Sequence, residues 1–132
     1  ERMALLLTVR FEDLRQRHAL DVAQDLSAAT VRELARANTG ARIIVTAASR
    51  DMIEEVHWGL TPNEQSRLWW DISWIWGPPE DQLAHLFRTI GSERFVFGSA
   101  WPLRLAQTPR ANLALLPDEL RTHALCDPRT WS

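Results

Sequence analysis

The sequence predicts an α/β protein in which four strand–helix units follow one another and the strands run parallel. Four short apolar runs recur along the 132 residues, each followed by a polar or glycine-bearing turn and then by a segment with helical spacing. Strands that alternate with helices are joined by right-handed crossovers, which makes the sheet parallel. We expect a single domain over residues 1–132, because a chain of this length buries enough surface for one core.

The first unit begins with the apolar run 4–9 and continues through a long polar loop over 10–26. Ser27 is a good N-cap, and the helix that it opens should end at the Asn38-Thr39-Gly40 stop signal. This segment therefore predicts one complete strand–helix unit.

The second unit has the run 42–47, which is β-branched in its middle. Ser49 should cap a helix that reaches Gly59. The sequence Thr61-Pro62-Asn63-Glu64 is a capping box with proline at the first helical position, and it predicts one short helical turn.

The third and fourth units complete the alternation. The run 68–74 precedes a helix that Gly91 should stop, and the run 94–98 precedes helices expected at Thr108-Pro109 and over 118–125. In the helix that Gly91 should stop, the apolar residues at i, i+3, i+4 and i+7 are Leu83, Leu86, Phe87 and Ile90. In an open sheet and in a barrel alike, ligands bind at the carboxyl ends of such strands.

Composition excludes several classes of function. All 15 basic residues are arginines, they are scattered among 17 acids, and the formal net charge is −2, so we expect no nucleic-acid partner. No apolar run is long enough to span a membrane, and the single cysteine, Cys126, has no partner for a disulfide, so we expect a cytoplasmic protein. Because Glu1 leads almost at once into an apolar run, we expect a fragment of a longer chain.

Charged residues are dense directly after the first strand, where Arg10, Glu12 and His18 lie within one short loop. One interpretation is a solvated loop whose acids and arginines pair with one another. The functional interpretation makes Arg10 and Glu12 polar groups at the end of the strand that orient a carboxylate or carbonyl substrate.

The third strand also ends in polar residues. Asp71 and Ser73 are two positions apart and should share one face, with Trp70, Ile72 and Trp74 on the other. They can act in a substrate pocket or simply satisfy each other inside a barrel. The surrounding tryptophans, which more often serve as core than as a substrate platform, are Trp69, Trp70, Trp74 and Trp76.

The segment from Arg94 to Pro102 resembles the end of the barrel in the amidohydrolase-related superfamily. There the eighth strand runs as arginine, apolar residues and then Phe-Gly-Ser-Asp-x-Pro, and this chain matches except at Ala100, where the family has its metal-binding or proton-transferring aspartate. Residues 70–73 and 91–94 resemble the seventh strand and the turn into the eighth. The resemblance implies the C-terminal half, strands five to eight, of a (β/α)₈ TIM barrel of about 250 residues, without its N-terminal half.

The resemblance also implies a metal-dependent hydrolase or decarboxylase, yet the metal ligands are missing from this half. The fifth and sixth strands of the family usually end in histidines, whereas this chain has Arg10 or Glu12 and Thr46 or Ala47 there. No metal-like spacing relates the four histidines, all expected at the surface, which are His18, His57, His85 and His123. We therefore expect no cofactor on this chain, with a divalent metal such as zinc held by the longer parent protein.

Three hypotheses follow. The first is the C-terminal part of an amidohydrolase-type enzyme, inactive alone, that acts on a small-molecule substrate. The alternative is a metal-free pseudoenzyme or ligand-binding scaffold barrel, which Ala100 favours, and the third is a free-standing open α/β binding domain. A half barrel should need its N-terminal half or self-association. The sequence assigns no catalytic residue, and the substrate-pocket candidates are Arg10, Glu12, His18, Asp71, Ser73, Trp74, Ser99 and Arg104.

Overall fold

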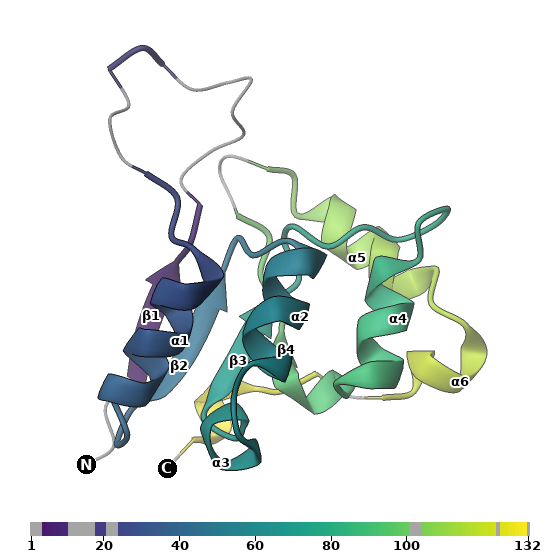
Figure 1. Cartoon of the computed structure of the whole chain (residues 1–132). Coiled ribbons are helices and arrows are strands. Elements are labelled where there is room, and N and C mark those ends of the chain that lie inside the picture. The colour runs from purple at the N-terminus through teal and green to yellow at the C-terminus, as the bar shows by residue number, and fades with distance from the viewer. Residues whose placement is uncertain (1–3, 11–17, 21–23, 101–103, 124, 132) are drawn as a thin grey trace.

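The computed structural model describes residues 4–10, 18–20, 24–100, 104–123 and 125–131. It is an α/β fold with one four-stranded sheet, in which all strands are parallel and lie in the order in which they follow along the chain (Figure 1). The strands are β1 (Ala4–Thr8), β2 (Arg42–Thr46), β3 (Leu68–Asp71) and β4 (Phe95–Val96). The prediction of alternating strands and helices with a parallel sheet is confirmed.

The helices begin where capping residues predict them. Ser27 accepts a hydrogen bond from the Thr30 N–H, Ser49 caps the next helix in the same way, and both halves of the Thr61–Glu64 capping box are formed. The α-helices are α1 (Ala28–Ala37), α2 (Arg50–Trp58), α3 (Pro62–Gln65), α4 (Gln82–Thr89), α5 (Gln107–Ala114) and α6 (Asp118–Arg121). Two 3₁₀ turns are η1 (Ser92–Arg94) and η2 (Pro128–Thr130).

Three elements are shorter than predicted. The third strand ends at Asp71, because the chain turns where the Ser73 hydroxyl bonds back to the Asp71 carboxyl. β4 has two residues, since η1 takes up Arg94 and the strand pairing stops at Val96. The last helix ends at Arg121, and five residues later the Cys126 N–H donates to the Phe95 carbonyl oxygen at 2.8 Å. That contact returns the chain to the sheet and adds a hydrogen bond to β4 beside its pairing with β3.

One face of the sheet forms the core. Val45, Trp70 and Phe95 lie side by side in register and are almost completely buried. Because consecutive parallel strands joined by right-handed crossovers place their helices on the same side, α1 and α2 cover this face (Figure 1). The face that they cover is therefore the apolar one.

The opposite face is less covered. Leu6 and Ile44 lie in register there, and Leu6 is 66 % exposed. Near the amino ends of the strands, Trp131 packs on Trp69 with ring centres 4.3 Å apart. The last described segment thus covers only one end of this face.

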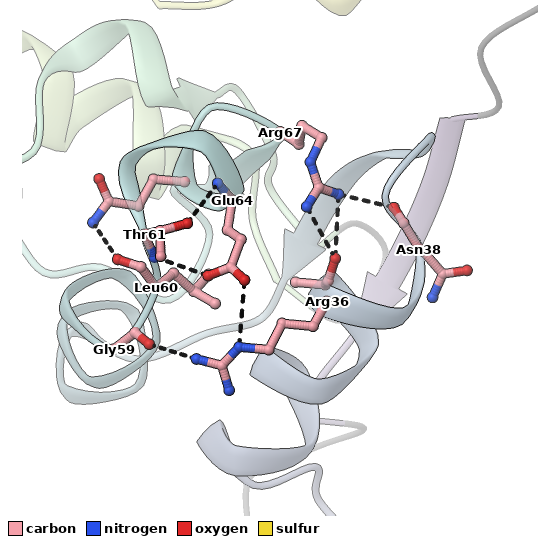
Figure 2. Close-up of polar contacts among 9 residues, drawn as sticks. Arg36, Asn38, Gly59, Leu60, Thr61, Glu64 and Arg67 are labelled. Atoms are coloured by element: carbon pink, nitrogen blue, oxygen red, sulfur yellow. Dashed lines mark hydrogen bonds and ion pairs between the residues drawn. The ribbon is translucent and has the colours of Figure 1, made fainter.

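Arginines tie the amino edge of the sheet to the helix ends. Arg67 donates to the carbonyl oxygens of Ala35 and Asn38 at the C-terminal end of α1. Arg36 donates to the Gly59 carbonyl at 2.9 Å and pairs with Glu64 at 3.4 Å (Figure 2). These cations lie where the helix dipole is negative, so they stabilise both helix ends. Within the described ranges, no helix combines the length and the apolar character that crossing a membrane requires.

Candidate functional site at the carboxyl edge

Asp71 is a buried carboxyl at the carboxyl edge of the sheet, with 5 % of its surface exposed. Its Oδ1 accepts the Ala47 N–H at 3.1 Å, and its Oδ2 accepts the Ser73 hydroxyl at 2.8 Å. Burial raises the pKa of Asp71 above its ordinary value, and the hydrogen bonds from Ser73 and Ala47 act in the opposite direction. The site thus favours the protonated acid more than water does.

Gly98, just after β4, presses directly against this carboxyl. A Cβ atom at Gly98 would lie 2.4 Å from Oδ2 of Asp71 and 2.8 Å from its Cβ, which no real side chain tolerates. Glycine is therefore required for β4 to approach β3 at this point. The Asp71 carboxyl is held between the ends of β2, β3 and β4.

Two alanines at this edge have left-handed backbone conformations. Ala47 follows β2 with φ 60°, and Ala100 follows β4 with φ 56°. Alanine pays roughly 1–2 kcal/mol for that conformation and has no polar side chain to offset it. The turn at Ala47 directs its N–H to Asp71, and the Ala100 carbonyl accepts the Arg104 N–H at 3.1 Å. Such strain is typical of functional sites.

Two arginines meet on the ring of Trp74. The guanidinium carbon of Arg104 lies 3.6 Å from the ring centre, and that of Arg10 lies 4.8 Å from it. Arg104 Nη1 also donates to the Ser73 carbonyl oxygen at 3.4 Å, and Arg10 Nε lies 4.0 Å from a carboxylate oxygen of Asp25. Cation–π contacts of this kind contribute about 0.5–2 kcal/mol each and fix the plane of the guanidinium.

The structure brings five of the predicted pocket residues to this edge, which are Arg10, Asp71, Ser73, Trp74 and Arg104. Trp74 was predicted on the face of Trp70, but β3 ends at Asp71, so the alternation does not extend to it and Trp74 contacts the arginines instead. Ser99 lies half-buried in the loop after β4.

Two further candidates do not join this group. His18 is exposed, and its Nδ1 accepts the N–H of Leu20 within the loop. Glu12 lies outside the described residues. Sequence analysis did not predict the hydrogen bond from the Ala47 N–H to Asp71, for which no local signal exists. It also did not predict that Gly98 packs against Asp71, because Gly98 was noted only as part of the motif shared with the family.

Two of the histidines, His57 and His85, make contacts within or between helices. His57 was expected at the surface but is 7 % exposed in α2, and burial together with the charge of Arg94 lowers its pKa. His57 is buried because it falls on the core-facing side of a helix that also buries Ile53 and Val56. His85 of α4 bonds to Glu54 of α2 at 2.6 Å, which links two outer helices.

The side chains at this edge do not fit a divalent metal. Among the residues that the structure describes, no three histidine, cysteine or acidic side chains gather as metal ligands. Asp71 already accepts two hydrogen bonds, and Ala100 supplies no donor atom. A catalytic zinc needs three protein ligands, so this part of the chain holds too few for the ion that the family resemblance implies.

The arrangement favours binding over nucleophilic attack. The Ser73 hydroxyl donates its hydrogen bond to Asp71, so the carboxyl fixes the direction of this hydroxyl. A protonated Asp71 can donate a hydrogen bond, and the two guanidiniums attract anions.

A separate cavity of about 440 Å³ lies at the amino edge of the sheet. Both arginines in its lining have structural partners, since Arg67 donates to backbone carbonyls and Arg42 lies over the Trp131 ring. Its lining comprises Thr39, Gly40, Ala41, Arg42, Asn63, Ser66 and Arg67. Parallel α/β folds place their chemistry at the other edge, so we assign the candidate site to the carboxyl edge.

Comparisons of the chain with protein-family models, with curated proteins and with solved structures found no match. The resemblance to amidohydrolase-related barrels stays a prediction from the residues themselves.

Proposed function

We propose that this chain is the C-terminal half, strands five to eight, of an amidohydrolase-type (β/α)₈ barrel, and that its carboxyl edge forms one wall of the substrate pocket of a hydrolase or decarboxylase. The strand order supports this. Four parallel strands in sequential order are what one arc of a barrel would have, whereas a doubly wound sheet reverses its strand order. The partly exposed face with Leu6 and Ile44 would be the barrel interior.

The observation that carries the proposal is the buried Asp71 carboxyl, held at the edge where barrels bind their substrates. In this scheme Asp71, Ser73 and Arg10 shape and orient the substrate. The N-terminal half supplies the metal ligands that this half lacks. A second candidate is a metal-free ligand-binding barrel, which the alanine at position 100 favours.

A ligand screen tests the proposal. The purified chain is heated with a panel of small amides, esters and carboxylic acids, and the midpoint of unfolding is recorded for wild type, Asp71→Asn and Asp118→Asn. The Asp118 side chain is 94 % exposed, so it provides a matched control. We expect at least one compound to stabilise wild type and the control but not Asp71→Asn; equal stabilisation of all three, or none, contradicts the proposal. Because this half holds too few metal ligands, turnover with Zn²⁺ is measured on the longer parent protein, where it separates the hydrolase from the metal-free binder.

The half-barrel proposal makes two further predictions for the purified chain. Elemental analysis should find no stoichiometric zinc, because the ligands are too few, and one tightly held zinc per chain would mean that ligands have been misplaced. Light scattering should report self-association, because the strand edge of β1 and the face with Leu6 need cover. A stable, non-aggregating monomer counts against the half barrel.

A further inference from the structure

We propose that the corner between α2 and α3, residues 57–67, is an acid-sensitive switch, in which protonation of the buried His57 ring loosens this segment from the fold. The corner lies at the amino edge, so the inference goes beyond the proposed function and does not depend on it. The corner also supplies part of the lining of the amino-edge cavity, namely Asn63, Ser66 and Arg67. Loosening of the corner therefore changes the shape of that cavity.

His57 lies in surroundings that favour the neutral imidazole. It is 7 % exposed and shares the core-facing side of α2 with Ile53 and Val56. Its ring packs edge-on against Trp58, with the ring centres 4.7 Å apart and the planes at 87°. An imidazolium at this position would lose hydration that apolar neighbours do not replace. The neutral ring fits the core, and the charged ring does not.

Arg94 of η1 adds a positive charge that acts on the same ring. Its Nη1 donates to the Ser66 carbonyl oxygen at 2.8 Å, and its guanidinium carbon lies 5.4 Å from the centre of the Trp69 ring. Because like charges repel, a proton on His57 acts against an arginine that itself bonds to the corner.

The acids of the neighbouring helices are paired with other groups. Glu64 of α3 accepts the Thr61 N–H at 2.8 Å and lies 3.4 Å from Nε of Arg36 in α1 (Figure 2). Glu55 of α2 lies 3.7 Å from Nη1 of Arg32, also in α1. Each of these carboxylates thus has a cation of its own, and the charge that acts on the buried imidazole is positive.

The direction of the pH effect follows from these surroundings. Burial first, and then the charge of Arg94, lower the pKa of His57 below 6.5, although the negative end of the α2 dipole favours a cation there. The unfolded chain therefore takes up this proton at a higher pH than the folded chain does. The corner has its full stability above pH 6.5, and this stability is lost as the pH falls from 6.5 through the lowered pKa. Glu64 stays ionised in the upper part of this range, since the hydrogen bond from the Thr61 backbone lowers its pKa below 4.5.

The corner is built so that it can open without the rest of the fold. Helix α3 has a single turn, and none of its residues is buried. The side-chain amide of Gln65 donates to the carbonyl oxygens of His57 and Leu60, at 2.7 and 3.1 Å, and the Leu60 N–H donates to the His57 carbonyl at 3.2 Å. An outward movement of His57 breaks these bonds together. Segments with few buried side chains open at a lower free energy than the whole molecule.

Amide hydrogen exchange, followed by NMR on the ¹⁵N-labelled chain, tests the switch. Protection factors, which correct for the intrinsic effect of pH on exchange, are measured from about pH 8 down to about pH 5, the range in which histidine takes up a proton. The corner is represented by the backbone amides of Leu60, Gln65 and Ser66, which bond within it. The reference amides are those of Asn38 at the end of α1 and Ile90 at the end of α4.

Four variants accompany wild type. His57→Phe keeps an aromatic ring beside Trp58 and cannot take up a proton, and His57→Gln is a second variant without a titrating ring. His85→Gln, which removes a partly exposed histidine from α4, is the control. Arg94→Gln removes the neighbouring cation, and the dispersion of the amide spectrum verifies that each variant is folded.

We expect the protection of the three corner amides to fall about fivefold or more with falling pH in wild type and in His85→Gln, and to change less than about twofold in both His57 variants and at the reference amides. In Arg94→Gln the midpoint at which the His57 ring signals titrate should rise toward pH 6.5. A fall in protection that persists in both His57 variants, or that reaches the reference amides equally, overturns the switch. Constant protection of the corner amides in wild type overturns it as well, and this comparison needs no variant to fold.

Discussion

The two edges of the sheet use arginine in opposite ways. At the amino edge, Arg36 and Arg67 donate to backbone carbonyls at the ends of α1 and α2 (Figure 2). At the carboxyl edge, the guanidiniums of Arg10 and Arg104 both lie over the ring of Trp74, 4.8 Å and 3.6 Å from its centre. The arginines at the amino edge are positioned by hydrogen bonds to helix ends, whereas those at the carboxyl edge are positioned by cation–π contacts with one tryptophan.

The backbone repeats this difference. The amino edge has satisfied caps and a complete capping box. The carboxyl edge has left-handed Ala47 and Ala100 and a buried acid, each of which costs stability. The strained backbone and the buried acid thus both lie at the carboxyl edge, as expected where a fold supports a binding site. Each of the following predictions tests this comparison.

Asp71→Ala should give the largest loss. Without the carboxyl, the Ala47 N–H and the Ser73 hydroxyl lose their partner and a small cavity forms, so we expect the free energy of unfolding to fall by about 2–4 kcal/mol. Urea denaturation measures it. Asp118→Ala, at an exposed position, is the control and should change it by less than about 0.5 kcal/mol. A mild effect of Asp71→Ala would mean that water replaces the carboxyl easily.

Arg67→Ala should destabilise the amino edge by about 1.5–3 kcal/mol, because the carbonyls of Ala35 and Asn38 lose a charged donor. Arg110→Ala, which removes an exposed arginine, should have an effect below about 0.5 kcal/mol. Chemical denaturation of both variants measures the two changes in the free energy of unfolding. If the two variants unfold alike, the amino edge does not depend on its arginines and the contrast between the edges fails there.

Substitutions at two glycines, one at each edge, form a matched pair with a smaller expected effect on the free energy of unfolding. At Gly98 an added Cβ collides with Asp71, so Gly98→Ala should lower the free energy of unfolding by about 1–3 kcal/mol. At Gly40 the added Cβ meets no atom within 4 Å, and Gly40→Ala should be neutral or stabilise by about 0.4–1 kcal/mol. Differential scanning calorimetry of both variants compares the edges directly. Equal tolerance at the two positions would show that β4 does not press on Asp71.

Sequence reasoning worked wherever the determinant is local. Ser27, Ser49 and the Thr61–Glu64 box each bond to atoms within three residues, so their helices begin as predicted. The contact between Cys126 and Phe95 after the last helix could not be predicted, since it joins distant parts of the chain.

The candidate site shows the same difference between local determinants and contacts between distant segments. Asp71 and Ser73 are two residues apart, and their pairing follows from that spacing. The meeting of Arg10 and Arg104 on Trp74 depends on the order of strands across the sheet, which no single segment encodes. The sequence could therefore name these residues as candidates, but it could not place both arginines on one ring.

The smallest predicted effect is a difference in pH dependence between the carboxyls of the two edges. Burial raises the pKa of Asp71 above 3.8, so its protonation stabilises the fold fully below that pH, and this contribution is lost as the pH rises through the raised pKa. At the amino edge, the hydrogen bond from the Thr61 backbone lowers the pKa of Glu64 below 4.5, so its contribution is present above that pH and is lost as the pH falls through the lowered pKa. Urea denaturation of wild type, Asp71→Asn and Glu64→Gln over a pH series measures both effects. The free energy of unfolding of wild type minus that of Asp71→Asn should decrease as the pH rises. The corresponding difference between wild type and Glu64→Gln should decrease as the pH falls. Because Asn can still accept the Ala47 N–H, Asp71→Asn removes the charge and keeps this hydrogen bond. If the two differences in unfolding free energy changed with pH in the same direction, the carboxyls of the two edges would not differ electrostatically.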